Sequence, residues 1–295
     1  MKILVTGSEG QLGWELLRQG DELGFEIVPA DLPEVDITRS DQVSQLLQHC
    51  KPSLLINAAA YTNVDKAETD KKAAFAVNRD GSAVLARQCR IDKIPLIHVS
   101  TDFVFDGLKK RPYLENDPIA PIGVYGQSKA AGEEVVRAQL KNHIIVRTAW
   151  LYGVHGHNFV KTMLRLAQER ETIRVVDDQY GCPTSAFDLA EALLTIAGRI
   201  RDNAEITFGT FHFCGKGIAT WFDFTKEIVK SAESYSPIKT THITPVTTDE
   251  FPTDAARPSY SALDCGLIEK RFGIIPKPWQ ESLKIAIDRI FSEHQ

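Results

Sequence analysis

Tyr125 and Lys129 have the residue types and the spacing that acid–base chemistry on a carbonyl group requires. They begin a segment with helical character, YGQSKAAGEE, and residues four apart lie on one face of a helix. A free phenol has a pKa of about 10, and a neighbouring ammonium lowers it toward the working pH, where a general acid is most effective. We therefore predict that Tyr125 donates a proton to a carbonyl, and that Lys129 lowers the pKa of Tyr125.

This pattern is weak by itself, because chance supplies about one tyrosine followed four residues later by a basic residue in a chain with 7 tyrosines and 34 basic residues. A second match, Tyr235 with Lys239, has Pro237 inside it, and proline breaks a helix. The second segment cannot form the helix that the pair needs. We therefore assign the chemistry to Tyr125 and treat Tyr235 as a chance match.

Polar residues follow the predicted strand Leu96–Ser100. Ligands bind at the carboxyl ends of strands in a doubly wound sheet, so Thr101 and Asp102 stand where a substrate would lie. The Thr101 hydroxyl can hydrogen-bond a substrate oxygen and orient the carbonyl. We predict that Thr101 forms one catalytic set with Tyr125 and Lys129.

A glycine-rich loop, TGSEGQLG, lies between the first predicted strand and the first predicted helix. Its residues Gly7, Gly10 and Gly13 permit a tight turn, the close approach of a pyrophosphate, and the packing of helix on strand. Free N–H groups at the start of the helix then face the anion. The order of strand, loop and helix predicts a dinucleotide site, with an ordinary strand-to-helix turn as the alternative. Tyr125 and Lys129 would reach its nicotinamide end.

Two acids, Asp31 and Asp36, follow the second predicted strand, where a carboxylate binds the adenosine ribose hydroxyls. An acid there favours NAD over NADP because it repels a 2′-phosphate, and no arginine lies directly beside either residue. The alternative for each is a turn acid at the end of a strand. We predict NADPH or NADH as the cofactor and leave the choice between them open.

Short apolar runs alternate with longer amphipathic segments in the first half, as the strand-helix-strand units of a parallel sheet require. The predicted strands are Ile3–Thr6, Glu26–Pro29, Leu54–Asn57, Leu96–Ser100 and Ile144–Arg147. The predicted helices are Leu12–Gln19, Val43–His49, Ala73–Cys89 and Ser128–Leu140. The pattern predicts an α/β fold with a doubly wound, Rossmann-like parallel sheet, over residues 1–150.

The second half is more mixed. Helices are predicted over Phe159–Glu169, Ser185–Ala197, Trp221–Ser231 and Gln280–Phe291. The segment 237–258 contains four prolines and cannot be a continuous helix. We expect residues 151–295 to form a smaller, interleaved substrate-binding domain, with strands that return to the main sheet.

The composition argues against several kinds of partner and site. The net charge is −5 and no basic block occurs, so a nucleic acid is not expected. The five cysteines are scattered and never spaced as Cys-x-x-Cys, so neither a disulfide framework nor a structural zinc site is expected. No stretch approaches the roughly 18 apolar residues of a membrane helix. We expect a cytoplasmic protein without a membrane partner.

Together these residues resemble the extended short-chain dehydrogenase/reductase family over nearly the whole chain. Within that family, the resemblance to reductases of a dTDP-4-dehydro sugar rests on further motifs: NAAAYT (57–62), VDKAE (64–68), STDFVF (100–105), RTAW (147–150), NF (158–159), TMLRL (162–166), DQYGCPT (178–184) and RP (257–258). It implies reduction of the 4-keto group of dTDP-4-dehydro-β-L-rhamnose to give dTDP-L-rhamnose.

The resemblance also implies roles by position. The residues implied to line the dinucleotide are Gly7, Gly10, Gln11, Leu12, Gly13, Asp36, Ile37, Ala58, Ala59 and Ala60. The residues implied to contact the sugar are Thr62, Val64 and Trp150. Some members form homodimers with a magnesium ion at the interface, for which Glu15 would be a ligand by position. His155 and His157 lie on a glycine-containing loop that we expect near the sugar instead of at a metal.

Two other functions stay open. A related epimerase or 4,6-dehydratase shares the fold and the tyrosine–lysine pair. A family dehydratase has a second acid after the strand-end aspartate, where this chain has Phe103 after Asp102, whereas local residues do not exclude an epimerase. A non-catalytic regulatory subunit, like the relative that accompanies methionine adenosyltransferase, needs only the fold and a docking surface. The joint presence of Thr101, Tyr125 and Lys129 favours an enzyme.

Overall fold

Six parallel strands form the central sheet of the protein, for which the computed structural model describes residues 1–202 and 204–292. Their order is β10-β5-β4-β3-β1-β2. The strands are β1 (Lys2–Thr6), β2 (Glu26–Ala30), β3 (Leu54–Asn57), β4 (Leu96–Thr101), β5 (His143–Thr148) and β10 (Gly209–His212). The five predicted strands agree with β1 to β5 within one residue at each end, and the doubly wound parallel sheet is confirmed.

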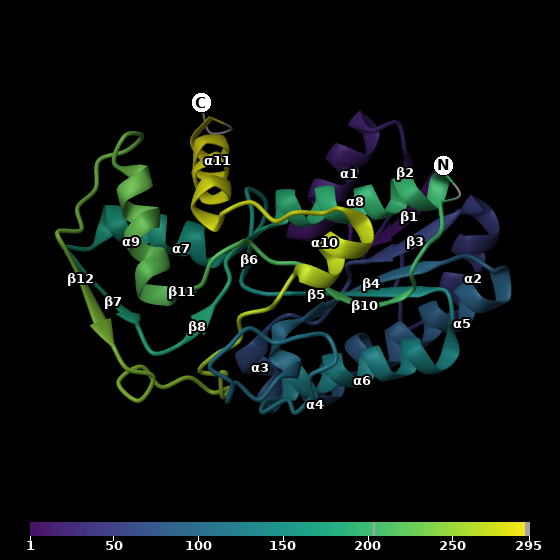
Figure 1. Cartoon of the computed structure of the whole chain (residues 1–295), viewed down its shortest axis with the longest axis horizontal. Coiled ribbons are helices and arrows are strands. Elements are labelled where there is room, and N and C mark those ends of the chain that lie inside the picture. Colours follow the sequence, from purple (N-terminus) through teal and green to yellow (C-terminus); the bar gives the residue numbers. More distant parts are fainter. Residues whose placement is uncertain (203, 293–295) are drawn as a thin grey trace.

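Helices cover both faces of this sheet (Figure 1). On one face α1 (Gln11–Glu22) packs beside α8 (Ala186–Arg201). The other face carries α2 (Ser40–Cys50), α5 (Ser82–Asp92) and α6 (Val124–Gln139). The helices predicted over Leu12–Gln19, Val43–His49 and Ser128–Leu140 are confirmed; α1 begins one residue, α2 three residues and α6 four residues earlier than the apolar periodicity indicates.

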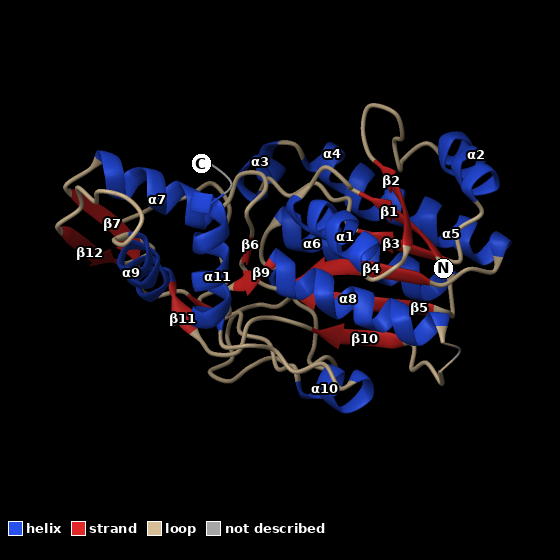
Figure 2. Ribbon diagram, turned by 90° about the horizontal axis from the view of Figure 1, so that it is seen from above, coloured by secondary structure: helices blue, strands red, loops and turns tan. Residues whose placement is uncertain are grey.

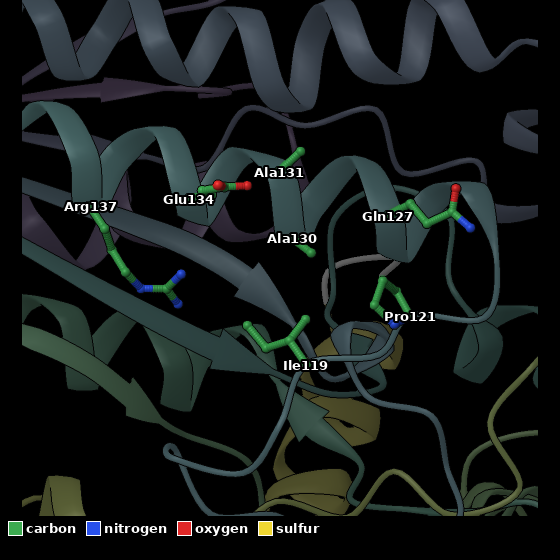
Figure 3. A pocket seen from close by; sticks show the side chains of 7 residues that line it. All are labelled: Ile119, Pro121, Gln127, Ala130, Ala131, Glu134 and Arg137. Carbon is green, nitrogen blue, oxygen red and sulfur yellow. The ribbon is translucent and has the colours of Figure 1, made fainter.

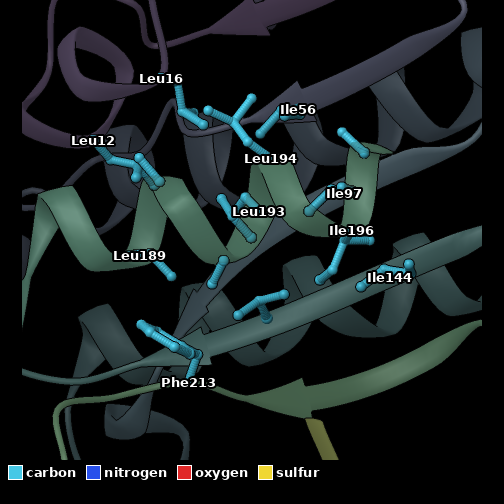
Figure 4. Close-up of a cluster of buried hydrophobic side chains, with 14 of the residues drawn as sticks. Leu12, Leu16, Ile56, Ile97, Ile144, Leu189, Leu193, Leu194, Ile196 and Phe213 are labelled. Atoms are coloured by element: carbon cyan, nitrogen blue, oxygen red, sulfur yellow. The ribbon is translucent and has the colours of Figure 1, made fainter. Parts of the chain in front are cut away.

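The strands contribute to two separate apolar cores. Ile56, Ile97 and Ile144 meet the leucines of α1 and α8 (Figure 4). Leu55 and Ile145, their neighbours along the strands, enter the core beneath the opposite helices. A strand that is buried on both faces must be apolar along its length, which explains the uninterrupted apolar runs in the sequence.

The strand order reverses at β1, which pairs with β2 on one side and with β3 on the other. At such a reversal the carboxyl ends of the strands leave a crevice in which ligands bind. Thr6 and Asn57, the last residues of β1 and β3, pair there, and the Thr6 hydroxyl donates to Asn57 Oδ1 at 2.8 Å. The topology therefore brings the glycine loop after β1 next to the small residues after β3.

The single helix predicted over Ala73–Cys89 is instead interrupted. The chain forms α4 (Lys71–Phe75), a π-helical stretch (Ala76–Gly81) and α5 (Ser82–Asp92). In the π-helical stretch the Asn78 amide accepts from Tyr61 N at 2.8 Å and donates to Ser128 Oγ at 2.9 Å. The spacing of apolar residues did not reveal the π-helical stretch, because the extra residue of a π turn leaves the segments on either side helical.

The second half builds a smaller lobe beside the sheet (Figure 2). Its core lies among α7 (Phe159–Glu169), α9 (Trp221–Ala232), α11 (Trp279–Ser292) and the parallel pair β7 (Thr172–Val176) and β12 (His242–Val246). The three helices predicted at these positions are confirmed. The fully described segment 237–258 forms β12 and turns and no helix, in agreement with its four prolines.

Parts of the second half return to the main sheet. The helix predicted over Ser185–Ala197 is α8, and it joins β10 and α10 (Gly266–Phe272) in the core beneath α1. Two short pairs, β6 (Leu151–Tyr152) with β9 (Thr184–Ser185) and β8 (Tyr180–Gly181) with β11 (Ala219–Thr220), complete the strands. Among the helices of residues 1–202 and 204–292, none combines the length and the apolar character needed to cross a membrane.

Candidate active site

A cleft with a volume of about 940 Å³ lies where β1, β3, β4 and β5 end, and residues of the second half close its other side. Of the residues predicted for catalysis, cofactor binding and substrate binding, all line this one cavity: Gly7, Gly10, Gln11, Leu12, Gly13, Asp31, Asp36, Ile37, Ala58, Ala59, Ala60, Thr62, Val64, Thr101, Asp102, Tyr125, Lys129 and Trp150. The fold therefore collects these segments, which are far apart in the sequence, at the crevice that the strand order predicts.

The glycine loop is compact enough to admit only glycine at two positions. Gly7 has a φ of +73°, and a Cβ there would lie 2.4 Å from Ala59 N. A Cβ on Gly13 would lie 2.1 Å from Gly7 O. With Gly10 as N-cap, the first turn of α1 opens into the cleft, so its N–H groups can receive a pyrophosphate. The loop therefore fits a dinucleotide.

The two acids after β2 both line the cleft but differ in their hydrogen bonds. Asp31 Oδ2 accepts from Glu9 N and Asp31 Oδ1 accepts from Leu32 N, each at 2.8 Å. Asp36 Oδ1 accepts from Thr38 N at 2.9 Å and forms a turn before α2. Asp31 is thus hydrogen-bonded directly to the glycine loop, whereas Asp36 caps a local turn.

Tyr125 is positioned by the first turn of α6. The helix begins at Val124, whose N–H donates to Glu68 Oε1 at 2.8 Å. The Tyr125 ring packs edge-on against Phe103, with ring centroids 5.6 Å apart. A Cβ on Gly126 would lie 2.2 Å from Phe103 O, so glycine lets the helix approach the end of β4 this closely. The phenol is thereby held at the strand end that carries Thr101.

The pKa of Tyr125 differs from the prediction. Burial of the phenol raises its pKa to about 12, an effect that the Thr101 hydroxyl opposes and the Asp102 charge reinforces. Lys129 was expected to lower this pKa, but its ammonium donates to Val99 O at 2.7 Å instead. The phenol therefore stays protonated across the neutral range, which a proton donor requires.

Lys129 is almost fully buried, with 3% of its surface exposed. Burial lowers the pKa of Lys129 to about 8, and the charge of Glu133 acts in the opposite direction. The bond to the carbonyl of Val99 fixes the ammonium beside the cleft. Lys129 can therefore present a charged donor to a bound cofactor below about pH 8.

Thr101 and Asp102 form a hydrogen-bonded pair at the end of β4. The Thr101 hydroxyl donates to Asp102 Oδ1 at 2.9 Å and accepts from Phe103 N at 3.2 Å. Burial raises the pKa of Asp102 to about 6. The pair places the Thr101 hydroxyl at the strand end that lines the cleft.

Trp150 follows β5 and lines the cleft. Its backbone conformation, with a φ of +47°, is unusual for a large residue. Its indole stacks on Trp221, which also lines the cleft. A Cβ on Gly181 would lie 2.3 Å from the Trp150 ring, so glycine leaves room for the stack. Backbone strain of this kind concentrates at functional sites.

Residues 1–292 match a family model described as RmlD substrate binding domain. The chain belongs to this family. A relative from Aggregatibacter actinomycetemcomitans, named dTDP-4-dehydrorhamnose reductase, is 41% identical over 285 residues, which are 96% of this chain and 97% of the relative. The family predicted from the motifs is thereby confirmed.

Two solved structures resemble this member of the RmlD substrate binding domain family closely. A dTDP-4-dehydrorhamnose reductase from Clostridium acetobutylicum has 41% identity and a TM-score of 0.92, covering 98% of this chain and 99% of the other. A dTDP-4-dehydrorhamnose reductase from Bacillus anthracis, solved in complex with NADP, has 38% identity and a TM-score of 0.90 at the same coverage. The likeness therefore extends over both the sheet and the smaller lobe.

In this RmlD family member the magnesium ligand expected at Glu15 finds no support. Glu15 lies outside the cleft, with 1% of its surface exposed, and accepts from Arg289 Nη1 at 2.8 Å and from Arg18 Nη2 at 3.4 Å. Two guanidinium groups thus contact the carboxylate that was expected to bind the magnesium ion. In the described part of the chain, no three or more histidine, cysteine, aspartate or glutamate side chains are grouped to hold a metal ion.

Of the two histidines expected near the sugar, His155 lies elsewhere. His155 stacks on Trp14 and its Nε2 bonds Glu9 O at 2.9 Å, so it lies against the glycine loop. His157 and Asn158 line the cleft, and Asn158 Nδ2 donates to Gln11 Oε1 at 3.0 Å. This segment therefore joins the second half to the dinucleotide side of the site.

Sequence reasoning did not assign a role to Trp221, Arg257 or Asn158, all of which line the cleft. Arg257 Nη2 donates to Asp65 Oδ2 at 2.8 Å and so ties the C-terminal part to the helix after β3. The RP motif is the one signal that pointed to Arg257. The second tyrosine–lysine match lies elsewhere, because Tyr235 bonds Asp288 and stacks on Phe291 in the smaller lobe.

Proposed function

We propose that this chain transfers a hydride from NADPH or NADH to C4 of dTDP-4-dehydro-β-L-rhamnose and so forms dTDP-L-rhamnose. The observation that carries the reaction type is the single cleft that contains the glycine loop, Thr101, Tyr125 and Lys129. The substrate rests on family membership and on the names of relatives that are 38–41% identical over 96–99% of this chain.

A bound nicotinamide cofactor would supply the hydride that reduces C4. Thr101 orients the carbonyl oxygen from the end of β4. As negative charge develops on that oxygen, the Tyr125 phenol, which is protonated at neutral pH, donates its proton to it. Lys129 places a buried positive charge beside the same region and donates to the cofactor ribose. The residues of the chain thereby provide position, a proton and a favourable charge.

We also propose a division of labour between the two halves. Residues 1–150, whose sheet β10 completes by pairing with β5, bind the dinucleotide, and residues 151–295 mainly bind the sugar nucleotide. Trp150, from the end of β5, and Trp221 would form the wall on the sugar side. A homodimer in the cytoplasm is part of the same proposal and follows from the family resemblance. Light scattering of the purified protein tests the dimer.

The decisive experiment supplies purified protein with dTDP-4-dehydrorhamnose and either NADPH or NADH. We expect oxidation of the cofactor and formation of dTDP-L-rhamnose, and no oxidation with dTDP-glucose as a control, which has no 4-keto group. Stable cofactor binding with interconversion of sugars and no net oxidation would identify an epimerase instead. Absence of turnover together with binding to another enzyme would indicate the regulatory function.

The pH dependence of kcat follows from the pKa values of the two central residues. Lys129 is charged below its pKa of about 8, so kcat is expected to fall as the pH rises through about 8. Tyr125 adds no second loss in that range because its pKa lies at about 12. The measurement is kcat at saturating substrates from about pH 6 to about pH 10. A constant kcat up to pH 10 would contradict this assignment.

Replacement of Asp31 with asparagine is expected to shift cofactor preference toward NADPH by roughly three- to tenfold in kcat/KM, because the negative charge that repels a 2′-phosphate is removed. Asparagine keeps an acceptor for one of the two N–H groups that Asp31 binds, so the loop is retained. Asp21→Asn, an exposed acid on α1 outside the cleft, is the matched control. An unchanged ratio of NADPH to NADH activity in Asp31→Asn would assign the carboxylate to the turn alone.

A further inference from the structure

On α6, a third residue follows Tyr125 and Lys129 on the same face of the helix and lies in the protein interior. Tyr125, Lys129 and Glu133 follow at intervals of four, so they form a row on the helix face that packs on the sheet. The Glu133 side chain is completely buried, with 0% of its surface exposed. A carboxylate is seldom buried in this way without a partner, and it lies one helical turn beyond the buried Lys129 ammonium.

Two arginines hold Glu133 in its charged form. Arg147 on β5 donates from Nε to Glu133 Oε1 at 2.8 Å and from Nη2 to Glu133 Oε2 at 2.7 Å. Arg137, at the exposed end of the same row, donates to Oε2 as well. Although burial acts to raise it, these bonds and the arginine charges keep the pKa of Glu133 at about 2. Glu133 therefore carries a negative charge throughout the neutral range.

Several titratable groups surround the row that contains Lys129, and Glu115 lies beside Arg147. In the part of the chain that the structure describes, the titratable groups facing the row come from α6, β4, β5, β10, the turn after β4 and the capping residue of α6: Tyr125, Glu133, Arg137, His98, His143, Arg147, His212, Asp102 and Glu68. His98 and His212 are buried and have pKa values of about 3, so they are neutral. Of these groups, Glu133 is the one whose charge raises the pKa of Lys129.

We propose that Glu133 is a positioning residue for the reaction: its buried carboxylate acts through Lys129, keeping the ammonium charged beside the cofactor site. Burial acts against the charged form of Lys129, and the Glu133 charge opposes that effect. Without the Glu133 charge, burial would act unopposed and Lys129 would lose its proton at a lower pH. Arg147 and Arg137 hold the carboxylate in place for this role. The inference rests on the proposed function, because the charge on Lys129 matters only where a cofactor binds.

A purely structural role for Glu133 predicts a different result. If the carboxylate only anchors Arg147, its removal lowers activity equally at every pH. If it acts through Lys129, activity is retained at low pH, where Lys129 is protonated in either case, and is lost as the pH rises. The shape of the pH profile therefore separates the two roles.

The test compares Glu133→Gln with Glu133→Asp and with Glu134→Gln. Glu134 is the neighbouring exposed residue of α6 and borders a smaller hollow on the outer side of the helix (Figure 3). In Glu133→Gln we expect the alkaline fall of kcat to move down by about one pH unit or more, with a rate near that of the unchanged protein at about pH 6. Glu133→Asp keeps the charge and should restore most of the profile. Glu134→Gln should leave it unmoved.

NADPH affinity as a function of pH, followed by nucleotide fluorescence, provides a second readout that does not need the sugar. It should weaken above about pH 8 in the unchanged protein and at lower pH in Glu133→Gln. If the sugar is not reduced but NADPH affinity still shifts with pH in Glu133→Gln, the proposed function is rejected and the role of Glu133 is supported. If Glu133→Gln does not fold, the double variant with Arg147→Met removes both members of the buried pair and is measured in the same way. An unmoved profile, or an equal loss at every pH, overturns the proposal.

Discussion

Replacing Tyr125 with phenylalanine is expected to lower kcat by roughly 10²–10⁴, which is the usual contribution of a positioned general acid. The substitution removes the hydroxyl that donates the proton and keeps the ring that packs on Phe103. NADPH affinity should change little, because the glycine loop and α1 provide most of the contacts with a dinucleotide. The measurement is kcat with saturating sugar nucleotide and NADPH, together with the NADPH dissociation constant.

Tyr235→Phe is the matched control for this variant. Tyr235 is also followed four residues later by a lysine, but its hydroxyl bonds Asp288 in the smaller lobe, outside the cleft. We expect its rate to equal that of the unchanged protein. An undiminished rate in Tyr125→Phe would remove Tyr125 from the mechanism and leave the proton to another group.

Replacing Gly13 with alanine is expected to weaken NADPH binding by roughly 5- to 150-fold, equivalent to about 1–3 kcal/mol of overpacking. The new Cβ would lie 2.1 Å from Gly7 O and 2.6 Å from Ser8 Cα, both of which are backbone atoms of the glycine loop. The loop must therefore move away from the start of α1, and the N–H groups that face a pyrophosphate would lose their arrangement. Titration of the variant with NADPH measures the effect.

The control for this variant is Gly198→Ala. Gly198 lies in α8, and nothing stands within 4 Å of a Cβ built on it. Alanine is the better helix former, so the free energy of unfolding should rise by about 0.5–1 kcal/mol without a change in NADPH affinity. Equal affinities in Gly13→Ala and the unchanged protein would refute the close approach of loop and helix.

Much of the site was predictable because its chemistry depends on local order. The interval between Tyr125 and Lys129, the glycines between a strand and a helix, and Thr101 after a strand each define a position along the chain. A doubly wound sheet then places all strand ends at one edge. Apolar runs also predicted β1 to β5 within one residue, since strands buried on both faces admit few polar residues.

Other features depend on contacts between distant segments. The pKa of Tyr125 was predicted to fall because Lys129 is four residues away, but burial and the bond from Lys129 to Val99 decide it. The family resemblance implied Glu15 as a magnesium ligand, and in the structure Arg289, at the far end of the chain, donates to it. Neither partner follows from the sequence around the residue.

The sequence by itself thus determined the fold class, the family and the order of the reacting groups, because periodicity and spacing are properties of adjacent residues. Only the tertiary structure decided the protonation of those groups and the tryptophan stack that lines the cleft. The pKa of Lys129 depends on its burial and on the charge of Glu133, and the stack of Trp150 on Trp221 joins two segments 71 positions apart. A pKa measures burial and nearby charge, and both exist only once the chain has folded.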